Sequence, residues 1–332
     1  MIKVRQATVS IKYNGKNVTE NIKPCFSSMT YTDVASGETD TISLALTDES
    51  NKWINGWFPI EGDFVETEIN QLNWTQIDDN KKLNCGKFLV DDYDFNGPPD
   101  TFNLKGIASP INSNFASTTN SKTWNKTTVK GIASNLAKKA GIALAFDASD
   151  YSLEKIEQSN QTDMAFLFSL CESYGFSMKL YNSKLIIFDE ERYEKKTSKG
   201  TIDKSDCSNY GLNGTLVGTY HGVSIKYTNT KTNKTLSYTY NPLKGSRILK
   251  LNEKAENLKD AELKAKARLR KANKASRTIT LELKGNIKYL AGTCFDITGF
   301  GKFNGKYYID KATHNFNTGY TVSLQMHKVI EY

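Results

Sequence analysis

Histidines and cysteines are the side chains most often used for metal or nucleophilic chemistry, and their spacing here argues against both. The three histidines are His221, His314 and His327, and none stands in an HExxH or HxH arrangement, so a zinc hydrolase is poorly supported. The five cysteines are odd in number, scattered and never spaced as CxxC, which argues against a disulfide framework and a structural zinc site. We expect them to be buried and reduced: Cys25, Cys85, Cys171, Cys207 and Cys294.

Other motifs with catalytic potential are equally weak. Gly299–Tyr307 looks superficially like a phosphate-binding loop, but its glycines are wrongly spaced and Tyr307 replaces the Ser or Thr that would hold magnesium. No GxSxG elbow occurs. Asp78-Asp79 and Asp91-Asp92 are adjacent carboxylates, and neighbours on a strand point to opposite faces, so neither pair makes an acid/base couple. The sequence therefore predicts no catalytic residues, no cofactor site and no metal ligands.

Four tryptophans could form a sugar-binding platform, although buried or interface tryptophans are the commoner outcome. They are Trp53, Trp57, Trp74 and Trp124.

The net charge of +8 comes almost entirely from lysine. Specific readers of nucleic acid favour the planar fork of arginine, so we expect no specific nucleic-acid binding.

The start of the chain and its apolar runs bear on location. Met1 opens directly into an alternating, strand-like segment, and no charged-then-apolar leader precedes it. No apolar run approaches the roughly 20 residues that a membrane-spanning helix needs. We expect synthesis and assembly in the bacterial cytoplasm, without membrane insertion.

Hydrophobic periodicity divides the 332 residues into three sections. Residues 1–108 read as β, with period-two alternation clearest in Thr41–Thr47 and further strands at 63–69, 87–92 and 101–107. Residues 109–195 predict an α+β module of two helices and a hairpin. One helix is capped by Thr127 or Thr128 and ends at Gly141; the other runs from Thr162 to Gly175, and the hairpin turns at Asn182-Ser183.

Residues 196–332 return to β, interrupted by a helix at about 253–275. Strands are expected at 222–227, 236–240, 278–284, 293–298, 306–310 and 320–326. The helix has a narrow, alanine-rich stripe, which suits close packing on the outside of the final β domain. On that hypothesis Ala265→Asp abolishes a soluble trimer. Its candidate packing residues are Ala255, Leu258, Ala265 and Leu269.

The first and last sections match each other in three blocks that follow in the same order. Thr41–Leu46 matches Thr278–Leu283, 62–66 matches 292–296, and 86–91 matches 305–310. We interpret these blocks as two copies of one β domain; the alternative is two unrelated β domains with similar hairpins. Copies of one fold can occupy equivalent positions in a ring. The positions that mark the repeat are Gly62, Gly86, Asp91, Gly292, Gly305 and Asp310.

Many weak matches, in conserved order, carry a family resemblance over about residues 86–327. They include Phe88–Asp92, Lys122-Thr123-Trp124, Gln161–Leu167, Tyr174-Gly175-Phe176 and Gly305–Ile309. In these stretches the chain resembles the phage late control D family, the baseplate hub proteins of contractile tails. The resemblance implies a mainly β fold in which two tube-like β-barrel domains flank a smaller α+β module.

The resemblance further implies a non-catalytic homotrimer in which three chains form a pseudo-sixfold ring. Such a ring would join a hexameric tail tube to a trimeric spike, with the tube protein, the spike and other baseplate proteins as partners. The particle would be a phage tail, whose lumen could carry DNA, or an R-type bacteriocin resembling a diffocin. The alternatives are a carbohydrate- or receptor-binding module of a tail and a tail-associated cell-wall hydrolase.

Overall fold

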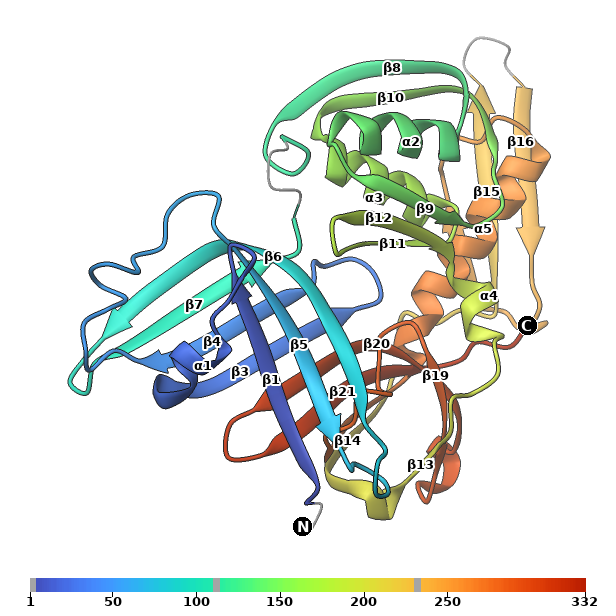
Figure 1. Cartoon of the computed structure of the whole chain (residues 1–332). Helices are drawn as coiled ribbons and strands as arrows, with labels where there is room; N and C mark the ends of the chain where they lie inside the picture. Colours follow the sequence, from blue (N-terminus) through green and yellow to red (C-terminus); the bar gives the residue numbers. More distant parts are fainter. Residues whose placement is uncertain (1–3, 110–113, 230–233) are drawn as a thin grey trace.

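The computed structural model describes residues 4–109, 114–229 and 234–332. One large sheet runs through the first and last sections of the chain, and the middle section sits above it as a separate α+β layer (Figure 1). The predicted fold class, mainly β with an α+β insertion, is confirmed. We call the part of the sheet built from residues 6–107 unit 1, and the part built from residues 201–214 and 277–328 unit 2.

Unit 1 is a bent sheet with the strand order β3-β4-β7-β6-β5-β1-β2. Strand β4 buries Ile42, Leu44 and Leu46 on one face, as its period-two pattern predicts. A short helix, α1 (Thr19–Ile22), follows β2. The strands are β1 (Gln6–Tyr13), β2 (Lys16–Asn17), β3 (Phe26–Val34), β4 (Thr41–Thr47), β5 (Phe64–Leu72), β6 (Lys81–Asn96) and β7 (Thr101–Ile107).

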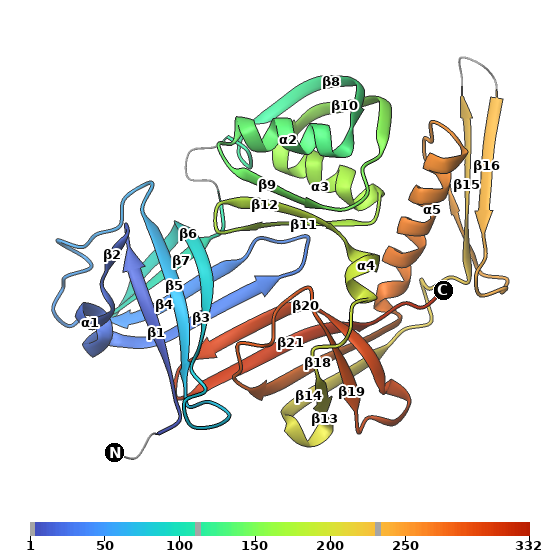
Figure 2. The same ribbon diagram turned by 45° about the vertical axis from the view of Figure 1, so that its right-hand side comes forward.

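Unit 2 has the order β14-β18-β21-β20, and β19 then pairs with both β20 and β13. Its strands are β13 (Thr201–Asp203), β14 (Cys207–Gly214), β18 (Arg277–Lys284), β19 (Cys294–Thr298), β20 (Gly305–Phe316) and β21 (Tyr320–Lys328). The two units join where β20 pairs antiparallel with β3, from Lys311 opposite Val34 to Phe316 opposite Met29. They lie side by side in Figure 2, unit 1 in blue and cyan and unit 2 mainly in red.

The strands of the two units follow one pattern. The order β3-β4-β7-β6-β5 corresponds strand for strand to β14-β18-β21-β20-β19, whereas the outer strands differ, because β1 pairs antiparallel with β5 and β13 pairs parallel with β19. Equivalent pairs even carry a β-bulge at the same place, between Val90 and Asp92 against β7 and between Ile309 and Lys311 against β21. The equivalent glycines Gly62 and Gly292, and Gly86 and Gly305, all have positive φ. That the units are copies of one domain stays a prediction, which this correspondence supports.

The middle section contains β8 (Thr119–Thr128), α2 (Val129–Lys139), β9 (Ala143–Asp147), β10 (Ser152–Thr162), α3 (Asp163–Ser173), β11 (Phe176–Tyr181), β12 (Lys184–Asp189) and α4 (Glu190–Glu194). Thr128 and Thr162 cap α2 and α3 by accepting backbone N–H bonds. Gly141 and Gly175 follow in the left-handed conformation. The long ribbon of β8 and β10 was not predicted, because both strands are mostly polar and exposed.

The last section holds a further layer that the sequence did not separate from unit 2. It consists of β15 (Gly222–Asn229), β16 (Lys234–Tyr240), β17 (Ile248–Leu251) and helix α5 (Leu258–Asn273), which is shorter than predicted because Asn257 caps it. The expected packing of this helix on the outside of the final tube-like sheet is wrong. Ala255, Ala265 and Leu269 are buried against Val223 and Ile225 of the hairpin instead.

Leu258 is a second correction to the packing stripe, because its side chain is 58% exposed. It is the first residue of α5, directly after the N-cap residue Asn257. The division into sections 1–108, 109–195 and 196–332 stays a prediction, with unit 2 and the hairpin layer both inside the last of them.

Candidate functional site: a buried charge network and two open sheet edges

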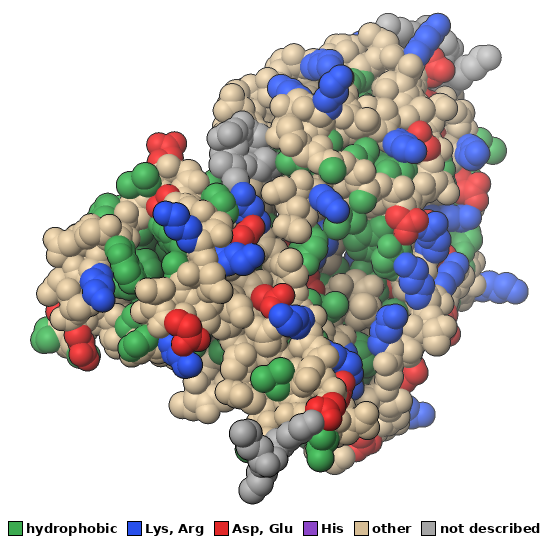
Figure 3. Space-filling view, in the orientation of Figure 1, with side chains coloured by type: hydrophobic (Ala, Val, Ile, Leu, Met, Phe, Trp, Pro, Cys, Tyr) green, Lys and Arg blue, Asp and Glu red, His purple; other side chains and the backbone are tan. Residues whose placement is uncertain are grey.

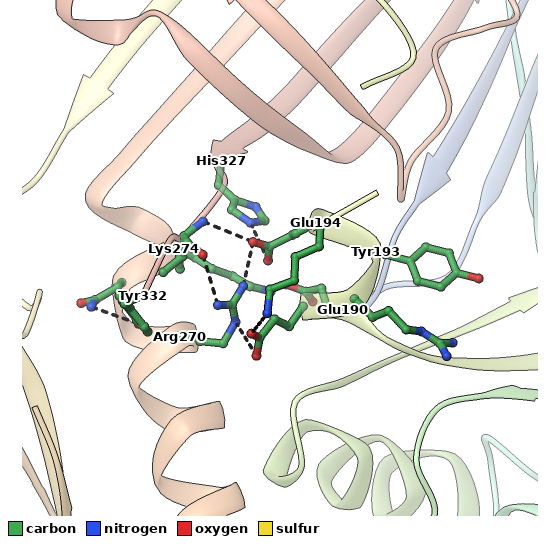
Figure 4. A network of polar contacts seen from close by, with 12 residues as sticks. Glu190, Tyr193, Glu194, Arg270, Lys274, His327 and Tyr332 are labelled. Carbon is green, nitrogen blue, oxygen red and sulfur yellow. Dashed lines mark hydrogen bonds and ion pairs between the residues drawn. The ribbon is translucent and has the colours of Figure 1, made fainter. Parts of the chain in front are cut away.

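A buried network of charges joins unit 2 to helices α4 and α5 and to the C-terminal segment (Figure 4). Arg270 Nη2 of α5 donates to Glu194 Oε2 at 2.7 Å, and its Nη1 donates to the carbonyl of Ile330 at 3.3 Å. His327 Nε2 lies 3.4 Å from Glu194 Oε1, while its Nδ1 lies 2.8 Å from the Asp310 carboxylate. The network therefore ties together four segments that are far apart in sequence.

His327 and Glu194 each stabilise the charged form of the other. Burial disfavours the imidazolium of His327, but the carboxylates of Asp310 and Glu194 outweigh burial and raise its pKa to about 9. Burial likewise opposes ionisation of Glu194, but His327 and Arg270 lower its pKa to about 2. At neutral pH the histidine is therefore a cation between two carboxylates, which makes it a fixed structural charge and a poor proton-transfer group.

The same place holds a group with metal-ligand side chains. Ligand atoms of Glu190, Glu194 and His327 all lie within 4.8 Å of one another. Each already has a partner, since Glu190 accepts from Ser177 Oγ at 2.8 Å and forms an ion pair with Lys274. A protonated His327 has no lone pair to give a metal ion. The arrangement supports a structural junction, because these ligand atoms already have partners.

A second buried junction ties the hairpin of β11 and β12 to unit 1. Lys179 Nζ lies 2.5 Å from Asp33 Oδ1 and 3.1 Å from Asp40 Oδ2. Burial raises the pKa of Asp40 to about 7, against the opposing effect of Lys179, and the charge of nearby Asp33 adds to the increase. Lys179 thus forms ion pairs with two carboxylates, of which Asp40 is the harder to ionise.

The other histidine in the sheet, His314, is neutral. His314 Nδ1 lies 2.7 Å from Tyr320 Oη, and its Nε2 lies 3.1 Å from the carbonyl of Tyr289. Burial lowers its pKa to about 4. Its ring stacks on Tyr31 at 5.7 Å across the β20–β3 seam, so this histidine also belongs to the joint between the units.

A groove of about 750 Å³ lies between β1, α1 and the turn after β20, and its charged lining residues are Arg5, Glu20, Lys23 and Lys284 among mostly neutral ones. The segment Gly299–Tyr307, which resembles a phosphate-binding loop only superficially, forms a turn with a short 3-10 helix at Gly301–Phe303. Gly299 and Gly301 have positive φ, and residues from Gly305 onward continue as β20. Across the described ranges, no helix is long and apolar enough to cross a membrane.

The remaining sequence-predicted residues divide between core and surface. Cys85, Cys171 and Cys294 are buried, Cys25 and Cys207 are half-buried, and all five are free thiols. Trp53, Trp74 and Trp124 are buried, so no platform of four tryptophans exists, and only Trp57 among them is exposed. The residues of the charge network were not predicted, because nothing in the spacing of Glu194, Arg270 and His327 links them.

Many exposed apolar side chains lie in two groups, one in each unit of the large sheet. In unit 1 the loop before β5 exposes Ile54, Trp57, Phe58 and Ile60, and Phe58 packs on Tyr93 and Phe95 of β6. Hydrophobic side chains gather over unit 1 at the left of the view in Figure 3. In unit 2 the edge strand β14 and the residues after it expose Tyr210, Leu212, Leu216 and Val217. Apolar surface at open strand edges is typical of interaction sites.

Comparison with known proteins shows the family to which the chain belongs. The model of the YQBQ-like family matches residues 115–327. The chain belongs to the YQBQ-like family.

Its relatives include two phage proteins that share one name. The "Probable baseplate hub protein" of Escherichia phage P2 is 27% identical over 230 residues, which cover 66% of this chain and 55% of the relative. The protein of the same name from Escherichia phage 186 is 25% identical over 258 residues, which cover 75% and 61%. The predicted resemblance to baseplate hub proteins is confirmed, and the matched part spans little more than half the length of these relatives.

A solved structure shows the same fold across the whole chain. The 43 kDa tail protein of prophage MuSo2 from Shewanella oneidensis superposes with a TM-score of 0.72 at 12% sequence identity. The match covers 98% of this member of the YQBQ-like family and 99% of the tail protein. The arrangement of two sheet units, an α+β layer and a flanking helix is therefore shared with a tail protein.

Proposed function

We propose that this chain is a structural baseplate hub subunit of a contractile tail, and that three copies assemble into a pseudo-sixfold ring. The observation that carries the proposal is the pair of units with one strand order, joined edge to edge within a single chain. Three chains would present six such units, which matches a sixfold tube on one side while keeping threefold symmetry for a spike on the other. The relatives named baseplate hub protein support the same role.

The partners follow from this role. The tail tube protein would stack on one face of the ring, and the trimeric spike and other baseplate proteins would bind elsewhere on it. We expect the contacts between chains to bury more than about 2,000 Å², which is the range of obligate assemblies. The protein would act in the baseplate of a phage or of an R-type bacteriocin particle, after synthesis and assembly in the bacterial cytoplasm.

The role needs no catalysis. The described histidines are a fixed cation (His327), a neutral core residue (His314) and a loop residue (His221) whose Nδ1 accepts the backbone N–H of Arg247. A zymogram on peptidoglycan tests the rival proposal of a cell-wall hydrolase, and a cleared band would contradict the structural role.

The first experiment is light scattering after size-exclusion chromatography of the purified chain. A mass near three times 37.2 kDa supports the ring. A monomer at every concentration argues against self-assembly and favours the second candidate, a carbohydrate- or receptor-binding module.

The exposed aromatic group of Trp57, Phe58 and Tyr93 is the observation that favours this second candidate. Stacking of sugars on exposed rings is the interaction that such a module would use. A glycan array tests it with wild type and Trp57→Ala: binding that disappears in the variant supports the module, and an empty array removes it.

A further inference from the structure

The edge strand β14 has the same position in unit 2 that β3 has in unit 1, but it lacks the partner that β3 has. Both strands pair with the next strand across a bulge, between Phe26 and Ser28 in β3 and between Cys207 and Asn209 in β14. Through these registers Met29 corresponds to Tyr210 and Tyr31 to Leu212. Met29 and Tyr31 are 0% and 2% exposed, whereas Tyr210 and Leu212 are 42% and 38% exposed.

The difference arises because β20 covers β3. Residues Lys311–Phe316 of β20 pair with β21 on one side and with β3 on the other. The equivalent segment of unit 1 is Asp92–Asn96 of β6, which pairs with β7 on one side. Strand β5 pairs with β6 only up to Leu89, so it leaves the other side of this segment open among the described residues. Unit 2 therefore has an open equivalent of β3, which is β14, and unit 1 has an open equivalent of the β20 segment, which is Asp92–Asn96. Within one chain, the seam itself forms between β20 and β3.

We propose that β14 of one copy pairs antiparallel with Asp92–Asn96 of β6 in a second copy, in the register of the β20–β3 seam. This inference rests on the proposed ring and assigns its interface strands and register. His314 lies opposite Tyr31 in the seam, so Phe95 is assigned to Leu212. Thr313 lies opposite Thr32, so Asp94 is assigned to Asn213, and Asp92 to Thr215.

The side chains fit this register. In the seam, the buried rings of His314 and Tyr31 stack face to face. Phe95 and Leu212 would take these places with two apolar side chains. Tyr93 would face Gly214, which has no side chain to obstruct the larger ring.

The backbone extends the match by one more bond. Ala35 N–H donates to the Asp310 carbonyl at 2.8 Å just beyond the seam. The equivalent bond runs from Leu216 N–H to the Asp91 carbonyl. Leu216 is 78% exposed in the single chain, whereas its equivalent, Ala35, is buried.

The two open segments cannot pair within one chain as it is folded. β14 is one end of the continuous sheet, and β6 lies beyond β18, β21, β20, β3, β4 and β7 along the same path. A head-to-tail contact of this kind leaves both segments free at the ends of an open array and satisfies all of them when the array closes. A second copy of this chain is therefore the occupant that the edges specify.

Disulfide trapping tests the register. One chain carries Asp94→Cys and a second carries Asn213→Cys, both in a Cys25→Ser/Cys207→Ser background because the other three cysteines are buried. Opposite residues of an antiparallel pair have Cα atoms about 4.5–5.5 Å apart, within disulfide range, whereas diagonal neighbours at about 7–8 Å lie outside it. The offset control replaces Asp94→Cys by Asp92→Cys. The positive control lies within the β20–β3 seam and places Thr32→Cys and Thr313→Cys in one chain, where these residues are opposite each other.

We expect mild oxidation of the mixed Asp94→Cys and Asn213→Cys chains to give a covalent dimer at least five times as abundant as that of the offset mixture. A light-scattering trimer without the in-register disulfide, or with equal yield from both mixtures, overturns the register while the ring stands. A monomer with no disulfide from either mixture, while the seam control oxidises, overturns both the register and the ring.

Discussion

The raised pKa of His327 makes the stability of the protein depend on pH in a direction that can be worked out. A pKa of about 9 in the folded protein, against 6.5 for a free histidine, corresponds to about 3 kcal/mol of preferential stabilisation of the imidazolium. Because the folded-state pKa is the higher one, this stability is fully present below about pH 6.5 and is lost as the pH rises to about 9. The lowered pKa of Glu194 describes the same ion pair, so the two contributions are not added.

The perturbation is His327→Gln, which keeps a polar side chain but removes the charge. Near pH 6 we expect the variant to be less stable than wild type by about 3 kcal/mol, since Glu194 then loses one of its two cationic partners. Near pH 9.5 the wild-type histidine is itself neutral, so the difference in free energy of unfolding should shrink to about 1 kcal/mol or less. Urea denaturation followed by tryptophan fluorescence at the two pH values measures both differences.

His314→Gln is the matched control. His314 is equally buried, but its pKa of about 4 keeps it neutral in the folded protein at both pH values, whereas an unfolded histidine is mostly protonated at pH 6. Its variant should therefore lose about 1 kcal/mol less stability at pH 6 than at pH 9.5, which is the opposite trend to His327→Gln. A difference between wild type and His327→Gln that stays constant from pH 6 to pH 9.5 would refute the assignment of His327 as a buried cation.

Three further predictions concern the packing of α5, the N-cap of α2 and the raised pKa of Asp40. Ala265→Asp should cost about 3 kcal/mol or more, because it buries an unpaired charge between α5 and the β15–β16 hairpin. Leu258→Asp, at the exposed start of the same helix, should change stability by less than about 0.5 kcal/mol, and thermal denaturation compares the two variants. Thr128→Ala removes the hydroxyl that accepts the Gly131 N–H and should cost about 1 kcal/mol in urea denaturation, with no change in mass by light scattering. Asp40 has a raised pKa, so wild type should lose stability as the pH rises from about 4 to about 7, and Asp40→Asn should lose less over the same range; parallel pH profiles would contradict the shift.

Local patterns in the sequence located most regular elements. The alternation of Thr41–Thr47 is enough to define β4, since one face of a half-buried strand must be apolar. The caps of α2 and α3 were predicted because Thr128, Thr162, Gly141 and Gly175 act on backbone groups within a few residues of themselves. The order of three matched blocks also indicated two related β units, which the common strand order supports.

These local patterns could not locate the polar strands or identify which elements pack against each other. β8, β10 and β14 expose most of their side chains, so they have no apolar period to read. Helix α5 was predicted as a helix, but its stripe of small residues fits any sheet, and the hairpin rather than the final tube-like sheet covers it. A stripe specifies that something covers the helix and does not specify what.

The sequence by itself thus determined the mainly β class, the helices and their caps, and the absence of a spaced catalytic motif, because each depends on neighbouring residues or on composition. Only the tertiary structure decided that Glu194, Arg270, Asp310 and His327 share one buried network, and that β20 joins β3. These contacts link residues up to hundreds of positions apart. Their energies depend on burial and on distances of a few ångströms, which the folded chain alone sets.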